Sequence, residues 1–444
     1  MINVTQKRRM FMSEKNTGYL AQFYKKSQTE RIQALIQAGF LEKEKQDAFD
    51  DQLAISLDIA NGMIENQIAT YQLPFGIATN FLIDGKDYVI PMAIEEPSVI
   101  AAASSAAKLV AQYGGFQTAV TDRLMIGQVI LTDVPHLSEA IAILHDNEIE
   151  IIQAANQAHP SIVKRGGGAD GIRIREIAED LTVGSPSFLI IHLHVETLEA
   201  MGANIINTMM EAIIPMLENL TNGNALMGIL SNYATECLAT ATCRLPVSAL
   251  AKDNWSGVEV RDRLILAAQV ATVDPYRAVT HNKGIMNGID AIVLASGNDW
   301  RAIEAGAHAY ASRSGQYRSL SSWRKADNGD LIGELTLPLS IGTVGGSISF
   351  HPGAQMAHHL LGNPDAETLE AIIASVGLAQ NFSALRALVT EGIQQGHMGL
   401  HARSLAISAG ASREEIDQVA TQLKTVKNMN LATAKEILKN IQKK

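Results

Sequence analysis

The stretch Met125-Ile126-Gly127-Gln128-Val129-Ile130-Leu131 decides the fold class, because strands and helices alternate from this point onward. It reads as a strand, and behind it we expect a helix at 137–158, a glycine-rich turn, a strand at 188–195 and a helix from about 198 to 220. Such alternation over roughly 100 residues is enough for a small α/β domain. The pattern therefore predicts a small domain set within a longer chain.

The segments before this stretch carry their own start and stop signals. Ser27-Gln28-Thr29-Glu30 is a capping box that opens a helix. Asp84-Gly85 stands between two apolar runs, which predicts a β-hairpin. Pro97 begins and Gly114-Gly115 ends an alanine-rich helix over 98–113, whose small side chains indicate a close neighbour.

The segments after it complete a mixed fold. We expect a buried strand at 291–295, a turn at 296–298 and a helix at 300–312. Beyond Gly396 the pattern is helical and ends in a lysine-rich tail. The chain of 444 residues is long enough for two or three domains with filled cores.

Composition excludes several classes of protein. The chain has 36 Lys+Arg and 46 Asp+Glu, a net charge of −10, which argues against binding to nucleic acid or to an anionic membrane. The run free of charged side chains, 335–364, is too rich in Gly, Pro and His to span a membrane. Cys237 and Cys243 fit neither a redox pair nor a zinc knuckle, and the first residues lack the apolar core of a signal peptide, so we expect a cytoplasmic protein.

Two segments combine reactive side chains. Glu95-Glu96 precede Pro97 at a helix start, where carboxylates stabilise the helix or, if one is directed into a site, hold a proton near neutral pH. The segment 274–290 is the densest in reactive types and places Lys283 in a Gly- and Asn-rich turn, sixteen residues before Asp299. Asp299 starts a helix, so it either caps that helix or holds the lysine ammonium in place.

Two further motifs are weaker. His397 and His401 lie four residues apart, but the Glu of a zinc protease motif is missing, so we expect no metal. The glycine run 166–171 could hold phosphates through backbone amides, although it lacks the G-x-G-x-x-G pattern of a Rossmann fold. From these residues alone, two enzyme classes remain open: a Schiff-base lysine enzyme using Lys283, and a carbonyl-reducing enzyme in which a charged lysine stabilises an oxyanion.

Taken together, the segments resemble class II 3-hydroxy-3-methylglutaryl-CoA (HMG-CoA) reductase, the bacterial soluble form. The resemblance is carried in the family's order by Glu65-Asn66 with Leu73 to Ala78, Glu95-Glu96-Pro97-Ser98, Glu199-Ala200-Met201-Gly202-Ala203-Asn204, Asp274 to Asp290, Gly297-Asn298-Asp299-Trp300 and Gly396-His397-Met398. The resemblance implies an α+β fold. A large mixed α/β substrate domain (1–124 and 232–392) would be interrupted by a small, non-Rossmann nucleotide-binding domain (125–231). A helical C-terminal flap (393–444) would carry His397.

The resemblance also implies a reaction, the reduction of (S)-HMG-CoA to mevalonate and free CoA with two NAD(P)H in the mevalonate pathway of isoprenoid synthesis. Lys283 would polarise the thioester carbonyl and stabilise the oxyanion of the mevaldyl-CoA intermediate. Glu96 would supply or relay a proton to the carbonyl oxygen in the mevaldehyde step. Asp299 would hold the lysine in place, and His397 would protonate the departing CoA thiolate.

The binding contacts follow from the same motifs. Those implied for the substrate are Glu65, Asn66, Ser98, Arg277 and Asn287, and those for the cofactor are Lys164, Arg165, Glu199, Met201, Gly202 and Asn204. The family's motif commonly has Asp where this chain has Glu199, a longer side chain of the same charge. Lys164 and Arg165 could meet a ribose 2′-phosphate, which favours NADPH over NADH; as solvated loop charges they would carry no such meaning.

The resemblance implies a homodimer, or a multiple of dimers, whose active sites are shared between subunits. The nearest alternative is the same enzyme working in reverse, as a catabolic mevalonate oxidoreductase that uses NAD and CoA. A catalytically silent acyl-CoA-binding protein on this scaffold is a second alternative.

Overall fold

A computed structural model of the chain describes residues 16–390, 392, 402–412, 414–426 and 428–442. The elements before and around the first sheet are η2 (Thr17–Leu20), η3 (Phe23–Lys25), α2 (Gln28–Gln37), η4 (Lys43–Phe49), α3 (Leu57–Met63), β1 (Phe75–Ile83), β2 (Lys86–Ala93), α4 (Val99–Ala111) and β3 (Gln117–Val120). Next come β4 (Leu124–Thr132), α5 (Leu137–Asp146), α6 (Glu148–Ala158), α7 (Pro160–Val163), β5 (Gly168–Ile177), β6 (Phe188–Glu196), α8 (Ala203–Thr221) and β7 (Asn224–Ser231). The rest are β8 (Leu238–Leu245), α9 (Val247–Leu250), α10 (Gly257–Val273), α11 (Pro275–Ala295), α12 (Trp300–Ala311), β9 (Ser321–Lys325), β10 (Leu331–Pro338), η5 (Gly346–Ser349), α13 (Pro352–Leu360), α14 (Ala366–Val389), α16 (Ile416–Leu423) and α17 (Leu431–Ile441).

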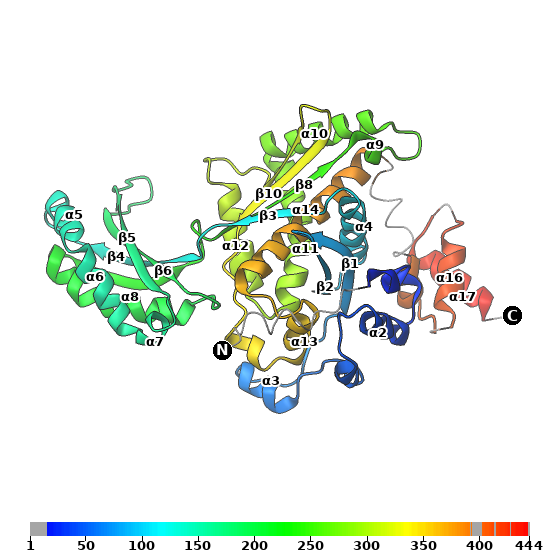
Figure 1. Ribbon diagram of the computed structural model, residues 1–444, viewed down its shortest axis with the longest axis horizontal. Helices are drawn as coiled ribbons and strands as arrows, with labels where there is room; N and C mark the ends of the chain where they lie inside the picture. The colour runs from blue at the N-terminus through cyan, green and yellow to red at the C-terminus, as the bar shows by residue number, and fades with distance from the viewer. Residues whose placement is uncertain (1–15, 391, 393–401, 413, 427, 443–444) are drawn as a thin grey trace, which may run out of the picture.

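The structure is an α+β fold with two main hydrophobic cores, as Figure 1 shows. The larger core joins the antiparallel sheet β3-β8-β10-β9 and the hairpin β1-β2 to α4, α10, α11 and α14. Helix α14 packs against α4, α11 and β8. It is long and apolar enough to cross a membrane, but most of it is buried inside the protein, so its composition is that of a core helix.

The smaller core belongs to what we call the small unit, residues 124–231, which stands at one end of the molecule in Figure 1. Its four strands form one antiparallel sheet in the order β5-β6-β4-β7. Helices α6 and α8 pack on one face of this sheet, and α5 packs against α8. The expected alternation of strands and helices is therefore present, in an antiparallel arrangement.

Several elements expected from the sequence are confirmed. Ser27 caps α2 with its side chain and pairs with Glu30 as a capping box. Asp84 and Gly85, with φ of 47° and 77°, form the turn between β1 and β2. The expected helix at 300–312 is α12.

The glycine-rich turn expected after the second helical segment is present directly after α7, and Gly168 begins β5. Two expectations about elements were wrong. The helix expected at 137–158 is interrupted at Asn147 and forms α5 and α6. The apolar segment 291–295 is the end of α11, since a short apolar run does not distinguish a strand from a buried helix.

Lys283 likewise lies within α11, where a turn was expected. Asp274 starts this helix by accepting a hydrogen bond from the Arg277 amide, and Pro275 occupies the first helical position. A Cβ at Gly288 would lie only 3.1–3.2 Å from side-chain atoms of α14. This glycine is therefore explained by the close approach of two helices, which outweighs the low helix propensity of glycine.

Candidate active site

An ion pair connects α11 to the turn before α4. Lys283 Nζ lies 2.8 Å from Glu96 Oε2, and Asn287 Nδ2 donates to Glu96 Oε1 at 3.4 Å. Lys283 and Asn287 are four residues apart, so they lie on the same face of α11. The structure thus brings together one predicted catalytic carboxylate, the predicted lysine and one predicted substrate contact from segments about 190 residues apart.

Ser98 is held in an unusual state beside this pair. It precedes the first residue of α4 with φ of 79°, in the left-handed region that side chains other than glycine rarely adopt. Its Oγ is buried and has no hydrogen-bond partner in the described structure. A strained backbone and an unpaired buried hydroxyl both cost stability, and both are typical of a ligand-binding position.

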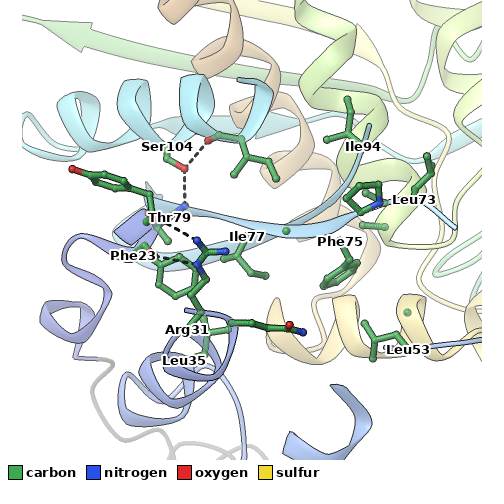
Figure 2. A pocket seen from close by; sticks show the side chains of 18 of the residues that line it. Phe23, Arg31, Leu35, Leu53, Leu73, Phe75, Ile77, Thr79, Ile94 and Ser104 are labelled. Atoms are coloured by element: carbon green, nitrogen blue, oxygen red, sulfur yellow. Dashed lines mark hydrogen bonds between the residues drawn. The ribbon is translucent and has the colours of Figure 1, made fainter. Parts of the chain in front are cut away.

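A large cavity of ≈ 1690 Å³ opens beside Glu96 and Ser98. Figure 2 shows its walls: Phe23, Arg31 and Leu35 come from the N-terminal helical segment, Phe75, Ile77 and Thr79 from β1, and Ser104 from α4. Leu53, Leu73 and Ile94 add apolar surface. This volume exceeds the 300–1,000 Å³ of ordinary small-molecule pockets, so the cavity can accept a long, partly apolar ligand.

Most polar residues that line the cavity were not predicted from the sequence. Ser104 Oγ donates to the Ile100 carbonyl and accepts from the Thr79 amide, which fastens α4 to β1. Arg31 donates to the carbonyls of Phe23 and Tyr24 and so shapes the N-terminal wall. Lys108 lines the cavity one turn beyond Ser104 and is exposed. The alanine-rich pattern of α4 indicated close packing, and the polar residues within it were the available signal for a site.

Asp299 and Arg277 are placed by the start of two helices. Asp299 accepts hydrogen bonds from the amides of Arg301 and Ala302 and lies 3.3 Å from Arg301 Nε, so it caps α12. Arg277 is half-buried in the first turn of α11, and desolvation lowers the pKa of its guanidinium. A half-buried arginine favours a carboxylate or phosphate partner.

Of the five predicted substrate contacts, only Ser98 lines the cavity, and Arg277, Asn287, Glu65 and Asn66 do not. Glu65 and Asn66 are exposed in the segment between α3 and β1, and they are not among the residues that line the cavity. Asn66 has φ of 55°, which Asn adopts more readily than most residues. His397 lies outside the described residues, as does His401.

The predicted cofactor residues form two groups in the small unit. Lys164 and Arg165 follow α7 and are exposed, and Arg165 Nε donates to the Ser161 carbonyl. Met201, Gly202 and Asn204 lie at the start of α8. Gly202 has φ of 91°, and a Cβ there would lie 2.3 Å from the Thr197 side chain, so only glycine fits. The free amides at this helix start could hold a phosphate.

Glu199 has structural partners in the large core. Its Oε2 accepts from Thr343 Oγ1 at 2.6 Å and from the Ala366 amide at 2.8 Å, and its carbonyl accepts from the Thr343 amide. Glu199 therefore holds the small unit against the start of α14. A longer side chain than the family's usual Asp suits this reach.

The other chain crossing between the two cores is also held by a charged residue. Arg123 forms a buried ion pair with Glu370 at 2.7 Å and donates to the carbonyls of Leu198 and Ile341. Cys237, on the returning segment, donates to Glu370 Oε1. Desolvation raises the pKa of Glu370 to about 7, although the neighbouring Arg123 lowers it. Both cysteines, Cys237 and Cys243, are free and buried.

The described residues contain no group of three or more His, Cys, Asp or Glu side chains that could hold a metal ion.

Comparisons with known proteins agree with one another. A family model described as hydroxymethylglutaryl-coenzyme A reductase matches residues 27–402. The 3-hydroxy-3-methylglutaryl-coenzyme A reductase of Archaeoglobus fulgidus is 46% identical over 419 residues, which cover 94% of each chain. A solved structure of the Streptococcus pneumoniae reductase is 48% identical, with a TM-score of 0.82, and the match covers 95% of this chain and 99% of that one. A structure of the class II reductase from the same organism, bound to NADPH in open conformations, is also 48% identical, with a TM-score of 0.80 and coverage of 94% and 100%.

Proposed function

This chain belongs to the hydroxymethylglutaryl-coenzyme A reductase family, and on that premise we propose that it reduces (S)-HMG-CoA to mevalonate and free CoA with two NADPH. The observation that carries the proposal is the Lys283–Glu96 pair next to a cavity long enough for a CoA thioester. The Lys283 ammonium and the Glu96 carboxylate lie 2.8 Å apart and form an ion pair. A charged lysine suits oxyanion stabilisation rather than Schiff-base chemistry.

The residues divide the chemistry among them. Lys283 stabilises the oxygen that becomes negative when hydride reaches the carbonyl carbon of the thioester, and again when hydride reaches the aldehyde. Glu96 relays a proton from the Lys283 ammonium to that oxygen in the aldehyde step, and Asn287 holds the second oxygen of Glu96. Asp299 orients Lys283 when substrate is bound, and His397 protonates the CoA thiolate as it leaves. Two NADPH molecules, bound in succession, would supply one hydride each.

The cavity suits the substrate's two ends. The half-buried Arg277 and the unpaired Ser98 hydroxyl suit the carboxylate and hydroxyl of the HMG group, with Asn287, Glu65 and Asn66 as further contacts. The apolar walls of β1 suit the pantetheine arm, and Arg31 and Lys108 lie where phosphates could be attracted. We therefore assign substrate binding to residues 1–124 and 232–392, cofactor binding to 125–231 and the flap to 393–444.

NADPH is the proposed cofactor, with Lys164 and Arg165 near its 2′-phosphate and Met201, Gly202 and Asn204 near its pyrophosphate or nicotinamide. Gly202 supports this placement, because no side chain can block the start of α8. Glu199 would affect cofactor binding indirectly, because its bonds to Thr343 and Ala366 hold the segment 199–204 in place. The Streptococcus pneumoniae relative is titled as bound to NADPH.

A homodimer with shared active sites is proposed from the surface of α10 and α11. Leu266, Val270 and Val273 on α10, and Tyr276 and Val279 on α11, are all exposed, and they form an apolar surface at helical spacing. The Lys283 side chain is 60% exposed in a single chain, so a partner subunit could cover it. Sedimentation of Leu266→Glu would test this, since a dimer dependent on this surface would dissociate. We also propose a cytoplasmic location.

The function is tested by following absorbance at 340 nm when HMG-CoA is added to the purified protein with NADPH or NADH. We expect NADPH oxidation that yields mevalonate and one free thiol per substrate. No change in absorbance with either cofactor would refute the enzyme proposal and favour the acyl-CoA-binding alternative. A strong NADH preference, with rapid mevalonate oxidation in the presence of NAD and CoA, would favour the catabolic direction.

A further inference from the structure

The face of the small unit's sheet that carries no helix is polar. Along β6, Ile191, Leu193 and Val195 are fully buried against the helices. Successive side chains of a strand point to opposite faces, so His192 and His194 point away from those helices. Figure 1 shows α6 and α8 together on the other side of the sheet.

Register brings basic and amide side chains together on this open face. His192 on β6 pairs with Gln128 on β4 and with Arg173 on β5, so these three residues form one row across the sheet. Arg175 lies two residues beyond Arg173 on the same face. Gln128 Nε2 lies 2.8 Å from His192 Nε2, and Arg175 Nη1 lies 3.5 Å from the same nitrogen.

A hollow of ≈ 350 Å³ lies over this row. It is lined by Ile126, Gln128, Arg173, Arg175, His192, His194, Ser231, Tyr233, Thr235 and Glu236. Its volume is within the range of small-molecule sites. The lining therefore combines two guanidinium groups, two imidazoles, an amide and several hydroxyls.

The positive charge in the hollow has no structural partner. Within the described part of the chain, Arg173 and Arg175 form no ion pair with a carboxylate. Glu236 is the one acidic residue of the lining, and its Oε1 accepts from Thr235 Oγ1. Burial, together with the nearby Arg175, lowers the pKa of His192 to about 4, so this imidazole stays neutral near pH 7. Such a site gains most from an anion that brings several acceptor oxygens.

We propose that this hollow binds the phosphate or diphosphate group of a small hydroxylated molecule, at a site separate from the NADPH contacts. Arg173 and Arg175 would take the phosphate oxygens in bidentate fashion, and Glu236 with Ser231 would accept or donate to ligand hydroxyls. Among the proposed cofactor residues, Lys164 and Arg165 directly follow α7, and Gly202 directly precedes α8.

The hollow also lies at the base of the small unit. Thr235 and Glu236 belong to the segment that returns from β7 to β8 in the large core, and Ile126 follows the outgoing crossing at Arg123. A ligand in this position would contact both the sheet and the returning segment. Occupancy would therefore restrict the orientation of the small unit.

The test uses inorganic pyrophosphate and the full chain, with binding followed by calorimetry in a buffer free of phosphate. We expect saturable binding at one site per chain, and binding weaker by about tenfold or more in Arg173→Gln and in Arg175→Gln. These side chains are exposed, so both variants should fold, which circular dichroism checks. Arg244→Gln, an exposed arginine of the large sheet, is the matched charge control and should bind as the unchanged protein does.

Two further measurements separate this site from the alternatives. Saturating NADPH should leave pyrophosphate binding unchanged, as should Arg165→Gln. Pyrophosphate should also raise the pKa of His192 from about 4, as read from its ring carbon resonance. Competition by NADPH, loss of binding in Arg165→Gln, or equal loss in Arg244→Gln would each overturn the proposal. None of these readouts requires turnover, so they are independent of the proposed reaction.

Discussion

Lys283 Nζ and Glu96 Oε2 lie 2.8 Å apart and join the third turn of α11 to the turn before α4. Each group is supported by a different part of the large core. α11 packs against α14, and α4 packs against both α14 and β1. The pair therefore depends on α14 as a common support, and its geometry is set by packing at some distance from the charges.

Removing the lysine should stop both reduction steps. Lys283→Ala is expected to lower kcat by about 100-fold or more for HMG-CoA and for free mevaldehyde, because both steps develop charge on the same oxygen. Steady-state rates with each substrate measure this. Lys86→Ala, which removes an exposed lysine at the start of β2, should have little effect. A variant that still reduced mevaldehyde normally would contradict the role given to Lys283.

Removing the histidine should separate the two steps. His397→Ala is expected to slow HMG-CoA reduction by about 100-fold, since the CoA thiolate then leaves without a general acid. Reduction of free mevaldehyde has no thiolate to protonate and should be largely retained. Equal losses with the two substrates would refute thiolate protonation by His397.

Replacing Ser98 should make the protein more stable and its binding of HMG-CoA weaker. Ser98→Gly removes both the left-handed backbone strain and the unpaired buried hydroxyl, so we expect the free energy of unfolding to rise by about 1 kcal/mol. The KM for HMG-CoA should rise about tenfold through the lost hydroxyl contact. Denaturant unfolding and steady-state kinetics measure the two effects.

Asn363→Gly is the control for Ser98, because Asn363 is exposed and has φ of 50° but lies outside the cavity wall. It should leave KM unchanged. An unaltered KM in Ser98→Gly as well would remove Ser98 from the substrate site.

Glu199 should act through position rather than through direct cofactor contact. Glu199→Asp shortens the side chain by one methylene and weakens the bonds to Thr343 and Ala366, so Tm should fall by about 2–4 °C. Thr343→Val removes one of those donors without changing the motif and should reproduce part of any rise in the KM for NADPH. If Thr343→Val left KM unchanged while Glu199→Asp raised it severalfold, a direct contact would be favoured.

Glu370 should make stability depend on pH. Because desolvation raises its pKa from 4.5 to about 7, the folded protein keeps the proton over a range in which the unfolded chain has lost it. The folded state then binds more protons, so the contribution of Glu370 to the free energy of unfolding falls as pH rises from about 4.5 to about 7.

Glu370→Gln should remove this slope. Chemical denaturation of both proteins at several pH values would show the stability difference between wild type and Glu370→Gln shrinking as pH rises through this range. A difference that stayed constant would show that Glu370 titrates in the folded protein as it does in the unfolded chain.

The sequence by itself determined the local elements with strong end signals and the identity of the reactive side chains. The Ser27 capping box, the Asp84-Gly85 turn and the start of α12 at Asp299 are set by neighbours within four residues. Motif resemblance supplied Glu96, Lys283 and Asp299 as catalytic residues, because the order of the motifs is a property of the chain alone, whereas the direct pairing of Lys283 with Glu96 came from the structure.

Tertiary structure decided the features that depend on distant neighbours. The helical state of 274–295 follows from packing of Gly288 against α14, which overrides local signals for a turn and a strand. The cavity combines walls from the N-terminal segment, β1 and α4, which are separate elements. The hydrogen bond between Glu199 and Thr343 and the Arg123–Glu370 pair each join residues at least 144 positions apart. Such contacts depend on burial and on proximity in three dimensions, and neither can be predicted from local patterns in the sequence.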